Sequence, residues 1–128
     1  MQKSPADLRH LVSMGNVSVP ELLEGRGSLD ARFLMAHSGN MTTEDARLYR
    51  KKGVHLSSTP SSEHQMGMGV PVPAFRKALD LTDLCSLGVD CHSLVSAFIP
   101  GEARLGLQSA RAIRGQVSNL VRQSADID

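Results

Sequence analysis

Aromatic residues and cysteines are scarce in this sequence of 128 residues. Aromatics make up only 3%, with three Phe, one Tyr and no Trp, which is little for a hydrophobic core that must stand alone. Cys85 and Cys91 are too few for a disulfide framework, and their spacing is not the C-x-x-C of a structural zinc site. Such sparse cysteine is typical of a reducing compartment, so we expect a cytoplasmic protein.

Two further absences exclude classes of partner. The 14 Lys and Arg residues nearly balance the 13 Asp and Glu residues, so the formal net charge is +1 and no overall field attracts nucleic acid or an anionic membrane. No apolar stretch approaches the roughly 18 residues of a membrane span, and the N-terminal MQKSPADLRH lacks the apolar centre of a signal peptide. We therefore expect neither a nucleic-acid partner nor a membrane.

Helical and strand patterns alternate along the chain. Ser18 with Glu21, and Thr42 with Asp45, have the spacing of capping boxes, and the apolar run at 31–36 predicts a strand buried on both faces. The expected order is a helix at 4–15, a short helix at 18–25, a strand at 31–36, a helix at 42–52, a strand at 54–58, a helix at 74–79, a strand at 84–89 and a long amphipathic helix from 102. This alternation predicts an α/β fold with a parallel sheet.

Polar side chains follow the predicted strands, at the edge of the sheet where ligands bind in such folds. His37 comes directly after the strand at 31–36, and Asp90 directly after the strand at 84–89. An imidazole and a carboxylate on adjacent strand ends can ligate one Zn²⁺ or Fe²⁺ ion, or act as a general base and its partner. The alternative is that each residue only caps the segment that follows it.

A predicted loop at 61–69 follows the strand at 54–58. Its polar side chains Glu63, His64 and Gln65 would match the edge of a heteroaromatic substrate, although composition alone favours a solvated turn. The glycines of this loop do not have the spacing of a dinucleotide-binding fingerprint. The sequence also has no G-x-S-x-G elbow, which argues against a serine hydrolase.

Short motifs in one order carry a resemblance to a known family. The motifs are Ala36-His37-Ser38-Gly39-Asn40-Met41-Thr42, Ser57-Ser58-Thr59-Pro60, Gln65-Met66-Gly67-Met68-Gly69 and Ser86-Leu87-Gly88-Val89-Asp90. In this order and at these separations they resemble the amidohydrolase superfamily, and more narrowly its cytosine deaminase, guanine deaminase and chlorohydrolase-like branch. The tail at 102–111 is similar to the helix that follows the final ligand in that family. The resemblance covers about residues 28–116.

The resemblance implies a metal-dependent (β/α)₈ barrel that hydrolyses C–N or C–halogen bonds of ring compounds with a metal-activated water. By position, His37 matches the metal-associated histidine after the sixth strand. Asp90 matches the aspartate after the eighth, which binds the ion, orients the water and takes up its proton. The implied cofactor is a divalent metal, Zn or Fe, and the implied partner is a small heterocyclic substrate. Glu63, His64 and Asn40 are its expected contacts.

The sequence departs from the family pattern in its metal ligands. It has no H-x-H and no H-x-x-E, the motifs in which the family places its other ligands and its acid–base glutamate. At most two of the usual ligands are therefore present, whereas a catalytic zinc normally has three from the protein. We expect little or no turnover from this chain alone. Two other functions stay open, a truncated or mis-split non-catalytic chain and a stand-alone α/β binding module.

The length also bears on the fold. A (β/α)₈ barrel takes about 250 residues, or roughly 31 for each unit, so the 128 residues amount to about four units. The three predicted strands agree with the last portion of a barrel, strands 6 to 8. We therefore expect residues 1–128 to form a single incomplete barrel segment, whose partner is the missing barrel half or a second copy of the chain.

Overall fold

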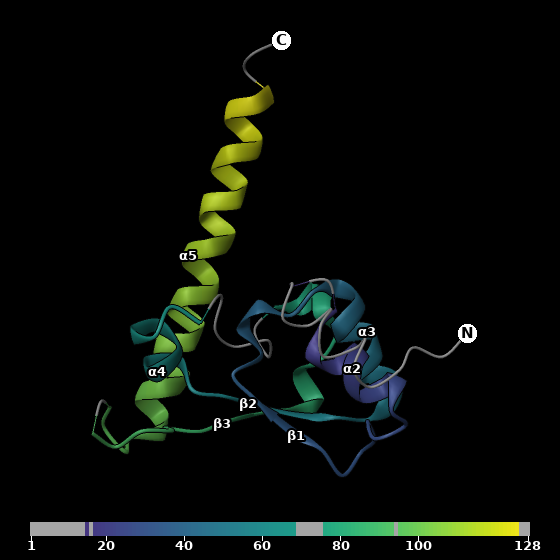
Figure 1. The fold of residues 1–128 in the computed structure, drawn as a ribbon. Coiled ribbons are helices and arrows are strands. Elements are labelled where there is room, and N and C mark those ends of the chain that lie inside the picture. Colours follow the sequence, from purple (N-terminus) through teal and green to yellow (C-terminus); the bar gives the residue numbers. More distant parts are fainter. Residues whose placement is uncertain (1–14, 16, 69–75, 94, 126–128) are drawn as a thin grey trace.

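A three-stranded parallel sheet lies at the centre of the computed structural model, which describes residues 15, 17–68, 76–93 and 95–125 (Figure 1). The strands are β1 (Leu34–Ala36), β2 (His55–Ser58) and β3 (Cys85–Leu87), and β2 lies between the other two. The pairing aligns Leu34 with His55 and Leu56 with Cys85. The parallel arrangement agrees with the alternation of strands and helices in the sequence. The predicted helix at 4–15 falls almost wholly outside the described residues.

Both predicted capping boxes are present. Helix α2 (Val19–Gly25) begins after Ser18, and helix α3 (Thr43–Lys52) begins after Thr42, and in each the capping hydroxyl and the acid three residues later satisfy each other's backbone N–H groups. Ser18 Oγ also donates to Asp45 Oδ1 at 2.5 Å, so the two boxes are joined. Helix α3 ends at Gly53 in the left-handed conformation.

The segment 61–69, predicted as a loop, begins instead as a short helix, α4 (Pro60–Gln65). Pro60 occupies a first-turn position that favours a helix. The N–H of Ser61 is satisfied by the carboxylate of Glu102, at 2.8 Å, from a helix 41 residues away. Local composition does not reveal that partner, and this is why the sequence favoured a turn. The predicted helix at 74–79 is, in its described part, the single 3₁₀ turn η3 (Lys77–Leu79).

The core lies on one face of the sheet. Helix α3 and the segment around the 3₁₀ turn η4 (Thr82–Leu84) cover that face, and the buried apolar residues are Leu29, Ala46, Tyr49, Val54, Leu56, Leu79 and Leu81. The other face is open, because Leu34 is 62% exposed and Ala36, His55 and Ser86 are exposed as well. The expectation that the first strand is buried on both faces is therefore wrong. In the described part of the chain no element covers the outer face of β1.

Helix α5 (Ile99–Ala125) begins beside α4 and then leaves the rest of the molecule (Figure 1). Its second half is solvated on all sides, with Val117, Leu120 and Val121 exposed by 55%, 65% and 62%. No helix among the described residues is both long and apolar enough to cross a membrane. Whether the sheet continues into a closed barrel stays a prediction.

Candidate functional site

The ends of the three strands bring His37, Glu63 and Asp90 together. His37 directly follows β1, and its backbone N–H donates to the carbonyl of Ser57 at 3.2 Å, which extends the pairing with β2 by one residue. His37 Nδ1 lies 3.7 Å from Glu63 Oε1, and His37 Nε2 lies 3.9 Å from Asp90 Oδ2. The imidazole therefore lies between two carboxylates. His37 and Asp90 come close together, but from β1 and β3 on either side of β2, and not from the adjacent strands that the sequence led us to expect.

The backbone at this edge of the sheet is unusual. His37 and Asp90 have positive φ angles, 55° and 60°, although neither is glycine. Such a conformation costs free energy for an L residue, least for Asn, Asp and His, and recurs where a side chain must point in one direction. In both cases it turns the chain sharply after a strand, and the two side chains meet.

Glu63 is held by the start of helix α4. Its Oε1 accepts a hydrogen bond from the backbone N–H of Thr59 at 3.0 Å, and its side chain is 0% exposed. Its Oε2 is buried and has no hydrogen-bond partner among the described residues. Thr59 Oγ1 lies 3.0 Å from His37 Nδ1, so Thr59 contacts both the imidazole and the buried carboxylate.

Asp90 has a partner of its own on helix α4. Ser62 Oγ donates to Asp90 Oδ2 at 2.5 Å. Sequence reasoning missed both Ser62 and Thr59 as site residues. Thr59 directly follows β2, so the rule that selected His37 and Asp90 at their strand ends would have selected it too. For Ser62 the sequence offers no signal, because its position depends on the helical turn that α4 forms.

The structure places His64 and Asn40 away from this cluster. The exposed His64 points to helix α5, where its Nε2 lies 2.6 Å from Ser109 Oγ. The exposed Asn40, in the 3₁₀ turn η1 (Ser38–Asn40), lines a hollow of about 250 Å³ that His37 also borders. Substrate contacts by these two residues and by the buried Glu63 stay predictions.

The hollow beside His37 is mostly apolar. Its apolar lining comes from α2, β1, the residue after η1 and helix α3, and includes Val19, Pro20, Met35, Met41 and Tyr49. Pockets for drug-sized ligands run from about 300 to 1,000 Å³, so a hollow of about 250 Å³ suits a single small ring. His37 thus borders both the carboxylate cluster and a space for a flat apolar group.

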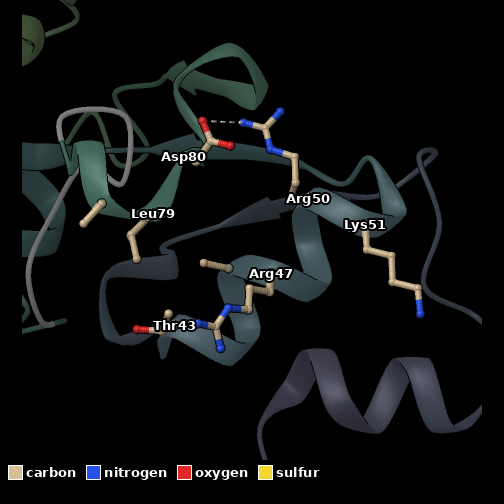
Figure 2. A pocket seen from close by; sticks show the side chains of 8 residues that line it. Thr43, Arg47, Arg50, Lys51, Leu79 and Asp80 are labelled. Carbon is tan, nitrogen blue, oxygen red and sulfur yellow. Dashed lines mark ion pairs between the residues drawn. The ribbon is translucent and has the colours of Figure 1, made fainter.

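A second hollow, of about 350 Å³, lies between α3 and η3 and contains none of the cluster residues (Figure 2). Its walls carry Arg47, Arg50 and Lys51, but much of this charge is compensated. Arg50 holds Asp83 with two hydrogen bonds of 2.8 and 2.6 Å, which lower the pKa of that carboxyl, and lies 3.7 Å from Asp80. This hollow therefore lies apart from the carboxylate and imidazole groups of the His37 cluster.

The cluster by itself does not fit the metal ion that the sequence leads us to expect. Two ligand atoms on a tetrahedral zinc with bonds of about 2.1 Å lie about 3.4 Å apart. His37 Nε2 and Asp90 Oδ2 are wider apart, at 3.9 Å, and Glu63 faces the other ring nitrogen of His37. Among the residues that the structure describes, no group of three or more His, Cys, Asp or Glu side chains is arranged to hold a metal.

No family model matches the chain. A stretch of 59 residues is 37% identical to an S-triazine hydrolase from Gordonia rubripertincta, and this match covers 45% of the chain but only 12% of that protein. The chain thus matches about one eighth of the length of that relative. The similarity supports a hydrolase ancestry for this part of the chain, at the level of the amidohydrolase superfamily.

Proposed function

We propose that this chain carries the water-activating edge of a hydrolase that removes an amino group or a halogen from a small heterocyclic ring. The observation that carries the proposal is the pair of His37 and Asp90, brought from the ends of β1 and β3 to 3.9 Å. That separation is too long for a direct hydrogen bond and leaves room for one water that contacts both side chains. The similarity to a triazine hydrolase supports the choice of ring substrate.

The chemistry assigned to the pair is general-base catalysis. Asp90 takes a proton from the water while the water oxygen attacks the ring carbon. The bond from that carbon to the amino or halogen group then breaks. The amino group leaves as ammonia after accepting a proton, and a halogen leaves as halide. Ser62 Oγ, bonded to Asp90 Oδ2, orients this carboxylate toward the water.

The substrate ring is assigned to the hollow of about 250 Å³ beside His37. Met35 and Met41 offer it apolar contact, and the amide of Asn40 offers one donor and one acceptor for the nitrogen-bearing edge of a ring. A ring held there has its edge next to His37, which borders both the hollow and the water position.

The barrel and the metal remain part of the proposal. The three parallel strands would be strands 6 to 8 of a (β/α)₈ barrel, and the open face of the sheet would then be part of the barrel interior. The expected Zn or Fe ion stays a prediction, since it would need His37 and Asp90 to approach to about 3.4 Å and at least one further ligand from outside the described residues, and no step of the proposed reaction depends on it. When bound, such an ion lowers the pKa of a coordinated water.

The test compares the chain with its Asp90→Asn variant. Asn tolerates the positive φ of residue 90, so the variant removes the base and keeps the backbone. The measurement is ammonia and chloride release from amino- and chloro-triazines over hours. We expect slow release, in keeping with the small turnover expected of this chain alone, that lies above the uncatalysed rate and falls toward that rate in the variant, since general-base catalysis contributes roughly 10²–10⁴-fold.

Asp80→Asn is the matched control. Asp80 also has a positive φ, 52°, but it is exposed beside Arg50 and lines the other hollow, which contains none of the cluster residues, so release should be unchanged. Equal release from the chain and from Asp90→Asn would contradict the proposal. Binding of a triazine without release from either protein would favour a non-catalytic binding module instead.

A further inference from the structure

Two buried glutamates of this chain differ in how well they are satisfied. Glu102 is 4% exposed, and both of its carboxylate oxygens accept hydrogen bonds from Ser61, at 2.8 and 2.5 Å. Glu63 is 0% exposed, yet among the residues that the structure describes only its Oε1 has a hydrogen-bond partner, the N–H of Thr59. A half-satisfied buried carboxylate is costly, so it is expected where its charge acts on a neighbouring group. The neighbour here is His37.

We propose that Glu63 is a positioning residue that holds the proton of the neutral His37 ring on Nδ1. A neutral imidazole has one N–H and one bare nitrogen, and its surroundings decide which is which. Glu63 Oε1 lies 3.7 Å from Nδ1, and Thr59 Oγ1 lies 3.0 Å from the same atom. A proton on Nδ1 therefore donates a hydrogen bond to the hydroxyl and is attracted by the buried negative charge.

Asp90 acts on the ring in the opposite sense, because its charge favours a proton on Nε2. Three features make its effect the weaker one. Its Oδ2 lies 3.9 Å from Nε2, beyond hydrogen-bond distance, and already accepts from Ser62. Its side chain is 39% exposed, so water screens its charge, whereas Glu63 is fully buried and its field is screened far less. Glu63 therefore decides the tautomer.

This tautomer has a consequence for the gap between Nε2 and Oδ2. With the proton on Nδ1, both atoms that face the gap are hydrogen-bond acceptors. Two acceptors at 3.9 Å are bridged by a molecule that donates to both, and a water does so with its two hydrogens. Because the water donates both hydrogens and accepts from neither atom, the lone pairs of its oxygen are left free for attack. This last step rests on the proposed function, whereas the tautomer itself does not.

The test reads the tautomer directly. Long-range ¹H–¹⁵N correlation spectra of ¹⁵N-histidine-labelled chain, at a pH where the ring is neutral, distinguish the protonated ring nitrogen from the bare one. The His37 signals are assigned by their loss in His37→Asn. We expect a protonated Nδ1 and a bare Nε2 in the chain. A protonated Nε2 in the chain would overturn the inference whether or not any variant folds.

Glu63→Gln removes the charge and keeps the size and the acceptor for Thr59, and we expect the proton of His37 to move mainly to Nε2. Glu44→Gln is the control, an exposed glutamate of helix α3 that pairs with Arg47, and it should leave the His37 tautomer unchanged. An unchanged tautomer in a folded Glu63→Gln would contradict the inference, as would a loss of the Nδ1 proton in Glu44→Gln.

Release assays separate this inference from the proposed function. If both hold, Glu63→Gln lowers kcat by about 10- to 100-fold with little change in KM, the usual effect of removing a group that orients a functional histidine. A protonated Nδ1 without any hydrolysis would leave the inference standing and contradict the function. Hydrolysis with the His37 proton on Nε2 would contradict the inference and leave the proposed function standing.

Discussion

Cys85, at the start of β3, illustrates how burial changes the chemistry of a single residue. It is half-buried against the core, and this desolvation, followed by the nearby charge of Asp83, raises the pKa of its thiol to about 11. The reactive form of cysteine is the thiolate, and its population at neutral pH falls tenfold for each unit by which the pKa rises. Cys85 is therefore a packing residue of the core and a poor nucleophile.

We predict slow alkylation of Cys85 by iodoacetamide in the folded chain. The measurement uses the Cys91→Ser variant, in which Cys85 is the single cysteine. Mass spectrometry follows the modification of Cys85 at pH 8. With a pKa of about 11 instead of 9.0, the thiolate population is about 100-fold lower, so the folded chain should react about 100-fold more slowly than the same chain in urea. Equal rates would contradict the burial of this thiol.

Two glycines, one at the end of a helix and one inside a helix, have different effects on helix stability, which single substitutions can measure. Gly53 ends helix α3 with φ of 67°, and a Cβ at this position would lie 3.4 Å from the Cβ of Ala31. Gly115 lies within helix α5, and a Cβ there would meet nothing within 4 Å. One glycine is required by its backbone conformation, and the other only weakens a helix.

Alanine at these two positions should have effects of opposite sign. Gly53→Ala should lower the free energy of unfolding by about 1 kcal/mol, because an L residue is strained at that φ. Gly115→Ala should increase helix content and stabilise by up to about 1 kcal/mol. Urea denaturation followed by circular dichroism measures both. A stabilising Gly53→Ala would show that the left-handed helix end is absent in solution.

The whole molecule exposes one face of its sheet. Parallel sheets are normally covered on both faces, but here Leu34, Ala36, His55 and Ser86 are exposed on the face opposite the core. β1 and β3 also each have an unpaired edge in the described part of the chain. Exposed apolar residues and free strand edges favour association with other chains.

We predict that the chain self-associates as its concentration rises, and that Leu34→Lys lowers this association. Leu34 is 62% exposed, so the lysine should leave the free energy of unfolding within about 0.5 kcal/mol. Light scattering across a concentration series measures association, and urea denaturation measures stability. Leu56→Lys, on the neighbouring strand but 0% exposed, should unfold the chain. A monodisperse wild-type chain at every concentration would contradict an open sheet face.

Local sequence patterns determined much of this fold. Two capping boxes and the glycine at the end of α3 follow from residues close together in the chain, because the hydrogen bonds of caps and turns form between near neighbours. The three strands and their parallel order follow from the alternation of strand and helix patterns along the sequence. The strand-end rule also selected His37 and Asp90, since the carboxyl ends of parallel strands meet at one edge of a sheet.

Only the tertiary structure decided what surrounds these two residues. Helix α4 depends on Glu102, and the burial of Glu63 depends on that helix, so neither follows from the composition of 61–69. The partner of His64 is Ser109, 45 residues along the chain. Which face of the sheet stays open also depends on where α3 and α5 lie. The physical reason is the same in each case, because burial and screening are set by atoms from distant segments, and a local pattern does not contain them.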